Sequence, residues 1–130
     1  MQREIKFKAL KKNTNQWLYG VPSYDMEYIY NEESMNSIDN YEIESNTICQ
    51  FTGLKDSVGN EIYEGDILQG ISNNLFSEGM IFNHIVIWGV DSWHIKDTFF
   101  SIQEFFNYCN NRVKIIGNIF EKQGLSIGVQ

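Results

Sequence analysis

Two carboxylates, Glu64 and Asp66, stand two positions apart in a stretch that also contains Thr52 and Tyr63. On a strand, side chains at positions i and i+2 point to the same face, and close carboxylate pairs act as general acid and base in some enzymes. Solvated carboxylates beside a glycine are much more common. Thr52, Tyr63, Glu64 and Asp66 are therefore candidates for a partner-binding site, and a small enzyme that uses Glu64 and Asp66 stays open as an alternative.

Other patterns that could support chemistry are absent from the sequence. A calcium loop begun at Asp56 needs an oxygen ligand at its third position and glycine at its sixth, where the chain has Val58 and Glu61. Neither a G-x-S-x-G nucleophile elbow nor a phosphate-binding loop occurs. The potential zinc ligands lack the short spacing of a zinc site: Cys49, His84, His94 and Cys109. We therefore expect no metal, no cofactor and no catalytic residue.

The same stretch has a structural interpretation as a hairpin followed by a corner. Residues 56–59, with the sequence DSVG, suit a type I turn that ends in a left-handed glycine. Val58 should keep a negative φ, because β-branched residues tolerate positive values badly. The glycines at positions 53 and 65 should mark sharp bends at the corners of a sheet.

Alternation of apolar and polar residues predicts a mainly β, α+β chain. Residues 5–9 and 17–21 should form an N-terminal hairpin, and residues 31–40 a mobile polar loop. Residues 123–130 should be a frayed tail. Further strands are expected at residues 24–30, 47–51, 61–63, 67–68, 81–82, 85–88, 93–99, 113–116 and 119–120.

One short helix is expected near residues 101–110. Ser101 and Glu104 have the spacing of a capping box, in which each side chain bonds the backbone N–H of the other residue. Apolar residues then recur at helical spacing from Ile102 to Cys109, so one face of this helix should be buried.

Composition and charge favour a folded protein of one domain. The chain has 130 residues, of which 42% are hydrophobic and 15% aromatic, and its net charge is −7. Half of its ten basic residues lie in the first twelve positions, and none lies between Asn13 and Leu54, where seven acidic residues stand. This balance argues against nonspecific binding of nucleic acid, although the basic N-terminal strand keeps that alternative open. The acidic middle could face a basic partner.

The sequence has neither an apolar stretch of about 20 residues that could span a bilayer nor an N-terminal apolar signal region. We therefore expect a cytoplasmic protein. Cys49 and Cys109 are 60 positions apart and belong to no paired motif. Two reduced, buried thiols are expected in that compartment, with a disulfide between them as the alternative.

Three blocks of the sequence resemble the YopX family of phage and prophage proteins: QFTGLKD at residues 50–56 with Gly59 and EIYEGDI at residues 61–67, REIKFKA at residues 3–9 with WLYG at residues 17–20, and IGNIFE at residues 116–121. Departures from the family pattern are Lys8, Leu10 and Val58, where Arg, Trp and Asn are usual.

The resemblance implies a single YopX-like domain over residues 1–130, with an N-terminal β subregion at residues 1–45 and a barrel subregion at residues 46–122. It implies an SH3-like barrel in the C-terminal part, self-assembly, and expression in the cytoplasm of a bacterial host. It implies no biochemical activity, because the family has no established role.

These observations lead to three hypotheses about function. The first is a non-enzymatic accessory protein that binds a protein partner or itself, because a catalytic constellation is missing and Tyr, Trp and Met residues are plentiful. The second is a nucleic-acid-associated small β-barrel protein that uses the basic N-terminal residues. The third is the small enzyme that uses Glu64 and Asp66. No membrane partner is expected.

Overall fold

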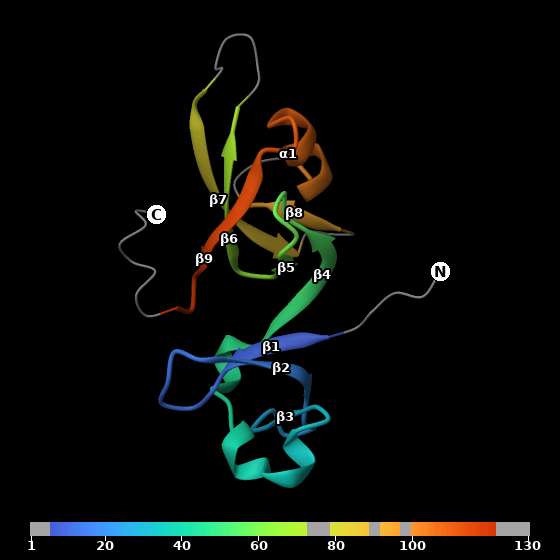
Figure 1. The fold of residues 1–130 in the computed structure, drawn as a ribbon, viewed down its shortest axis with the longest axis vertical. Coiled ribbons are helices and arrows are strands. Elements are labelled where there is room, and N and C mark those ends of the chain that lie inside the picture. The colour runs from blue at the N-terminus through green and yellow to red at the C-terminus, as the bar shows by residue number, and fades with distance from the viewer. Residues whose placement is uncertain (1–5, 73–78, 89–91, 97–99, 122–130) are drawn as a thin grey trace. The chain divides into compact units, whose positions relative to one another are not determined.

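The computed structural model describes residues 6–72, 79–88, 92–96 and 100–121 (Figure 1). The chain divides into two compact units, and the division falls between Gly53 and Leu54 in strand β4 (Cys49–Lys55). Within the described residues, no helix is long and apolar enough to cross a membrane.

The first unit is built on an antiparallel sheet. Its strands are β1 (Phe7–Leu10), β2 (Trp17–Pro22), β3 (Ile29–Tyr30) and the start of β4, in the spatial order β3-β2-β1-β4. Ala9 pairs with Leu18 across β1 and β2, which confirms the expected N-terminal hairpin. The core cluster of this unit consists of Ala9, Leu18, Ile29 and Ile43.

The strand that was expected over residues 24–30 is mostly a turn, and only β3 is extended. Met26 has a positive φ of 61°. The Ser23 hydroxyl donates a hydrogen bond to Asp25 Oδ1 and accepts one from the Tyr28 N–H. These local hydrogen bonds stabilise a turn in place of a strand. The turn therefore forms although apolar and polar residues alternate in this segment.

The polar segment after β3 contains two short 3-10 helices, η1 (Ser34–Asn36) and η2 (Ile38–Tyr41), and a third, η3 (Ser45–Thr47), precedes β4. Asn31 organises the start of this segment, because its Oδ1 accepts hydrogen bonds from the N–H groups of Glu33 and Ser34. Side-chain bonds of this kind are typical of asparagine in turns.

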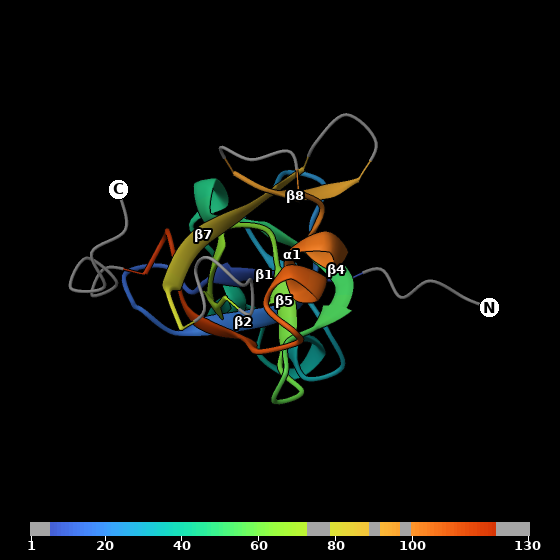
Figure 2. The same cartoon turned by 90° about the horizontal axis from the view of Figure 1, so that it is seen from above.

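The second unit contains a four-stranded antiparallel sheet in the order β8-β7-β6-β9. β7 curves along its length, as Figure 2 shows. At the start of the second unit, β5 pairs with the end of β4. The bounds are β5 (Glu61–Tyr63), β6 (Asp66–Ile71), β7 (Ile81–Trp88), β8 (Trp93–Ile95), α1 (Ile102–Tyr108) and β9 (Val113–Asn118).

A mainly β fold with one short α-helix is thus confirmed, and within the described ranges the two sheets do not close into a barrel. The two strands expected at residues 81–82 and 85–88 are one strand, β7, because β6 pairs with it without interruption. Residues 119–120 form a turn, not a strand. The expected strand end at residues 97–99 and the expected tail at residues 123–130 lie outside the described residues.

The helix α1 packs directly on β6 at Gly70. A Cβ atom on Gly70 would lie 2.5 Å from Phe105 Cζ and 2.6 Å from Cys109 Sγ, so this contact requires glycine. The core around it includes Leu68, Val86, Ile95, Ile102 and Phe105.

The expected capping box of α1 is confirmed. The Glu104 N–H donates to Ser101 Oγ over 3.1 Å, and the Ser101 N–H donates to Glu104 Oε1 over 2.9 Å. The bond from the Ser101 N–H is the largest of the effects that lower the pKa of Glu104 below its usual value.

A Glu whose pKa is lowered in the folded state adds stability above its unfolded pKa of about 4.3, and this stability is lost as the pH falls. We therefore expect the melting temperature to fall more steeply in the wild type than in Glu104→Gln between about pH 6 and about pH 3. Thermal unfolding monitored by circular dichroism across this range measures both slopes. Equal slopes would contradict this role of Glu104.

Candidate functional site

The central stretch of the sequence begins with the expected turn. The Gly59 N–H donates to the Asp56 carbonyl over 3.1 Å, and Gly59 has a φ of 93°, while Val58 is not among the residues with positive φ. Asp56 Oδ1 accepts from the N–H groups of Val58 and Asn60, and its Oδ2 accepts from the Ile115 N–H over 2.9 Å. The Asp56 carboxylate therefore shapes the hairpin and attaches it to β9.

Asp66 occupies the corner that follows the hairpin, and its side chain is fully buried. Its Oδ2 accepts from the Tyr63 N–H over 2.7 Å, and its Oδ1 accepts from Asn118 Nδ2 over 2.9 Å. Gly65 turns the chain with a φ of 83°, and its carbonyl accepts from the Ile119 N–H. The two blocks that contain Gly65-Asp66 and Asn118 therefore build one hydrogen-bonded corner.

Three of the four residues suggested by the sequence are buried. The side chains of Thr52, Tyr63 and Asp66 are 6%, 2% and 0% exposed, whereas Glu64 is half-buried. Glu64 lies in the turn before β6, so it does not share a strand with Asp66. A binding role for these residues stays a prediction, while the contacts of Asp66 indicate an architectural role.

Both histidines belong to the second unit, and each unit contains one cysteine. His84 packs edge-on against Phe105, with ring centroids 5.5 Å apart, and His94 Nδ1 lies 2.9 Å from the Ser92 carbonyl oxygen. Both cysteines are buried thiols, and burial raises the pKa of the Cys109 thiol. In the part of the chain that the structure describes, no three His, Cys, Asp or Glu side chains gather as metal ligands.

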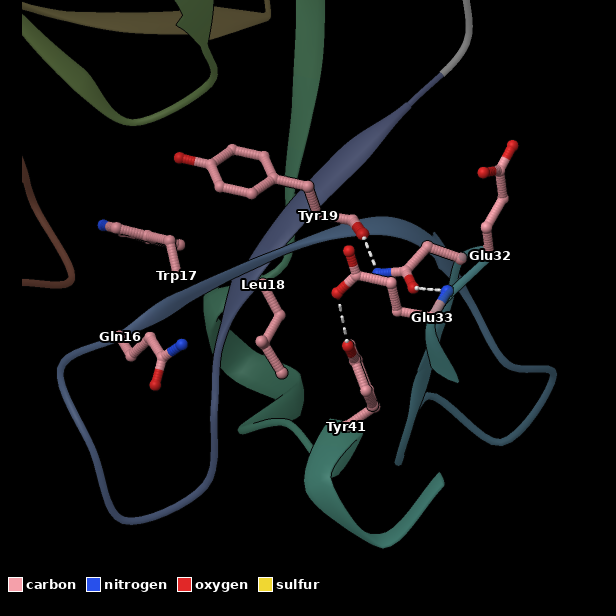
Figure 3. Close-up of a pocket in the computed structure, with 8 residues that line it drawn as sticks. Gln16, Trp17, Leu18, Tyr19, Glu32, Glu33 and Tyr41 are labelled. Atoms are coloured by element: carbon pink, nitrogen blue, oxygen red, sulfur yellow. Dashed lines mark hydrogen bonds between the residues drawn. The ribbon is translucent and has the colours of Figure 1, made fainter. Parts of the chain in front are cut away.

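A pocket that the sequence did not reveal lies in the first unit (Figure 3). Its volume is about 490 Å³. It is formed by the start of β2, the segment after β3 and the end of η2. Three aromatic residues and two carboxylates contribute to a lining made of Gln16, Trp17, Leu18, Tyr19, Asn31, Glu32, Glu33 and Tyr41.

Hydrogen bonds hold the opposite walls of this pocket in place. Asn31 Nδ2 donates to the Tyr19 carbonyl over 2.7 Å, which attaches the segment after β3 to β2. The Tyr41 hydroxyl donates to Glu33 Oε2 over 3.1 Å, and Figure 3 shows the Glu33 carboxylate directed toward Tyr41. The pocket thus has a defined geometry before any ligand enters.

The electrostatic character of the pocket is acidic. Its lining includes Glu32 and Glu33 and no basic side chain. Burial, followed by the hydrogen bond and negative charge of Glu33, raises the pKa of Tyr41 above its usual value. The Lys8 ammonium lies 4.3 Å from the centroid of the Trp17 ring, so one aromatic residue of the lining already contacts a cation. Such a pocket can bind an ammonium or a guanidinium group.

The sequence contained one signal of this site, namely the absence of basic residues between Asn13 and Leu54. That signal indicated a basic partner, but it could not indicate where the partner binds. Leu18 and Tyr41 meet only because β2 and η2 pack together in the fold.

Comparisons with known proteins identify relatives but no activity. The model of the family described as YopX protein matches residues 6–125. The crystal structure of protein EF1440 from Enterococcus faecalis matches with a TM-score of 0.61 and 21% sequence identity, over 95% of this chain and 99% of that chain. At this identity the match shows a shared fold only. No curated protein matches the sequence.

Proposed function

The chain belongs to the YopX family, and on that premise we propose that it is a non-enzymatic phage or prophage accessory protein that binds a protein partner. The partner presents a basic segment, and a Lys or Arg side chain of this segment enters the pocket of the first unit. The observation that carries the proposal is a preformed pocket whose lining residues include two glutamates and three aromatic residues and no basic residue.

The dimensions of the pocket support this function. A volume of about 490 Å³ lies within the range of about 300–1,000 Å³ that is typical of ligand pockets. Tyr and Trp side chains supply large contact areas at protein interfaces, and aromatic faces attract guanidinium groups. A carboxylate beside them adds a charge-assisted hydrogen bond.

The other hypotheses have less support. Phosphate groups would be repelled by Glu32 and Glu33, so the pocket does not favour nucleic acid. An enzyme that uses Asp66 would need its carboxylate to reach a substrate, whereas this group is buried and bonded to Tyr63 and Asn118. In our proposal the second unit is an SH3-like scaffold, and the protein acts in the cytoplasm of the bacterial host.

We expect the wild-type protein to bind a fluorescent peptide of alternating Arg and Ser residues, and the double substitution Glu32→Gln and Glu33→Gln to weaken this binding at least about tenfold. A hydrogen bond to a charged group contributes about 1.5–3 kcal/mol, and about 1.4 kcal/mol corresponds to a factor of ten in Kd. Fluorescence anisotropy at low and high salt measures the affinities, and binding should weaken as salt increases.

Two controls make this experiment specific. Glu27→Gln removes an exposed carboxylate of the same unit that does not line the pocket, and it should leave the affinity nearly unchanged. A peptide with citrulline in place of arginine keeps the shape of the side chain but loses its charge. Equal binding of both peptides, or equal effects of the Glu27 and the Glu32/Glu33 substitutions, would refute the proposal.

A further inference from the structure

A second cavity lies in the second unit, and it has a different chemical character. Its volume is about 210 Å³, and it lies beside the hairpin turn and along β6 and β9. Its lining includes the aliphatic residues Val58, Ile71 and Val113 and the basic residues Arg112 and Lys114. No acidic residue belongs to its lining.

Strand register places Gln69, Ile71 and Lys114 of this lining on the face of the sheet that is opposite to α1, whereas Val113 pairs with Gly70 and belongs to the core beside α1. Gly70 faces α1, so its neighbours Gln69 and Ile71 point to the other face of β6. Ile71 pairs with Ile81 of β7, which is 59% exposed, and Val58 on the turn is 71% exposed. The cavity therefore belongs to an apolar strip on an exposed sheet face.

The turn that forms one wall is attached to the start of β9 by hydrogen bonds of Ser57. The Ser57 N–H donates to the Val113 carbonyl over 2.8 Å, and the Val113 N–H donates to Ser57 Oγ over 2.9 Å. The Ser57 hydroxyl in turn donates to the Asn111 carbonyl. A ligand would consequently meet a wall that is already ordered, which lowers the entropic cost of binding.

Two basic side chains give the rim of the cavity a positive charge within a chain of net charge −7. Arg112 immediately precedes β9 and Lys114 is its second residue, and both belong to the lining of the cavity. Arg112 Nη2 donates to the Ser72 carbonyl over 3.1 Å, and this bond orients the guanidinium group. An arginine held in this way presents its other N–H groups to a carboxylate.

We propose that this cavity binds an acidic peptide segment of a partner protein, in which an aliphatic side chain fills the space between Val58 and Ile71 and a neighbouring carboxylate meets Arg112 and Lys114. This site is independent of the pocket in the first unit, and it selects the opposite charge. A single strand of nucleic acid is a less suitable ligand, because its bases stack on aromatic side chains and the lining of this cavity contains none.

The test uses a fluorescent, acetylated peptide of alternating Glu and Leu residues and the protein of 130 residues. We expect saturable binding in fluorescence anisotropy, about tenfold weaker binding for Lys114→Glu, and about fivefold weaker binding for Val58→Asn. Both residues are exposed, and Asn is well tolerated in turns, so both variants should fold. Thermal unfolding of each variant verifies this.

Matched controls separate this site from general charge and from apolar surface. Lys96→Glu and Val21→Asn make the same changes at exposed residues outside the cavity, and they should leave the affinity unchanged. Peptides with Gln in place of Glu, or Ser in place of Leu, should each bind about tenfold more weakly. Absence of saturable binding by the Glu and Leu peptide, or unchanged affinity in both cavity variants, would overturn the proposal. Displacement of the peptide by an oligothymidylate, with loss of oligothymidylate binding in Lys114→Glu, would assign the cavity to nucleic acid instead.

Discussion

Asp66→Ala is expected to lower the free energy of unfolding of the second unit by about 3 kcal/mol or more. The substitution removes the acceptor of the Tyr63 N–H and the acceptor of Asn118 Nδ2 at a position with no exposure to solvent. Buried donors that lose their partner retain the full cost of desolvation, which is about 1–3 kcal/mol for each group. The loss of free energy of unfolding therefore includes the desolvation of two donors and the cost of a small cavity.

Urea unfolding that is followed by the indole N–H signals of Trp88 and Trp93 measures the stability of this unit directly. Glu64→Gln is the matched control, because it removes a neighbouring carboxylate that is half-buried in the turn. It should change the free energy of unfolding by less than about 0.5 kcal/mol. If the two variants were equally stable, the hydrogen bonds of Asp66 would not stabilise the corner.

Gly20→Ala is expected to destabilise the first unit by about 3 kcal/mol. Gly20 has a φ of 154°, and a Cβ atom at this position would lie 2.1 Å from the Tyr30 carbonyl oxygen. This obstacle is backbone, so a rotamer change cannot relieve it. The strands β2 and β3 must move apart, and the pocket beside them must change shape as a consequence.

Gly53→Ala is the control for Gly20→Ala. Gly53 also has a positive φ, of 87°, but a Cβ atom there would have nothing within 4 Å. This substitution should therefore reveal the conformational strain alone, about 1 kcal/mol. The indole signal of Trp17 reports the unfolding of the first unit in urea. A loss of stability in Gly53→Ala that matches the loss in Gly20→Ala would show that the contact with Tyr30 has no effect.

Turn and capping patterns in the sequence predicted the features that depend only on neighbouring residues. The turn at residues 56–59 and the capping box of Ser101 and Glu104 were predicted because each is closed by bonds within a few positions. The strand expected over residues 24–30 was wrong for a related reason. The alternation of apolar and polar residues gives no information about the hydrogen bonds that Ser23 makes with Asp25 and Tyr28.

Features that join distant residues could not be predicted from spacing. The bond between Asp66 and Asn118 links positions that are 52 residues apart, and the sequence suggested only that Gly65 marks a corner. The pocket in the first unit likewise depends on how β2 packs against η2. The acidic composition of this region indicated the charge of a ligand but not the residues that would bind it.

The most direct test of the proposed function is a titration of the isotope-labelled protein with the peptide of alternating Arg and Ser residues, followed by the three indole N–H signals. Trp17 lines the pocket, whereas Trp88 and Trp93 belong to the second unit. We expect a saturable shift of the Trp17 signal, its loss in the Glu32→Gln and Glu33→Gln protein, and little change of the other two signals. If the Trp17 signal stayed in place, or if only the Trp88 and Trp93 signals shifted, this result would contradict binding of a basic partner at this pocket.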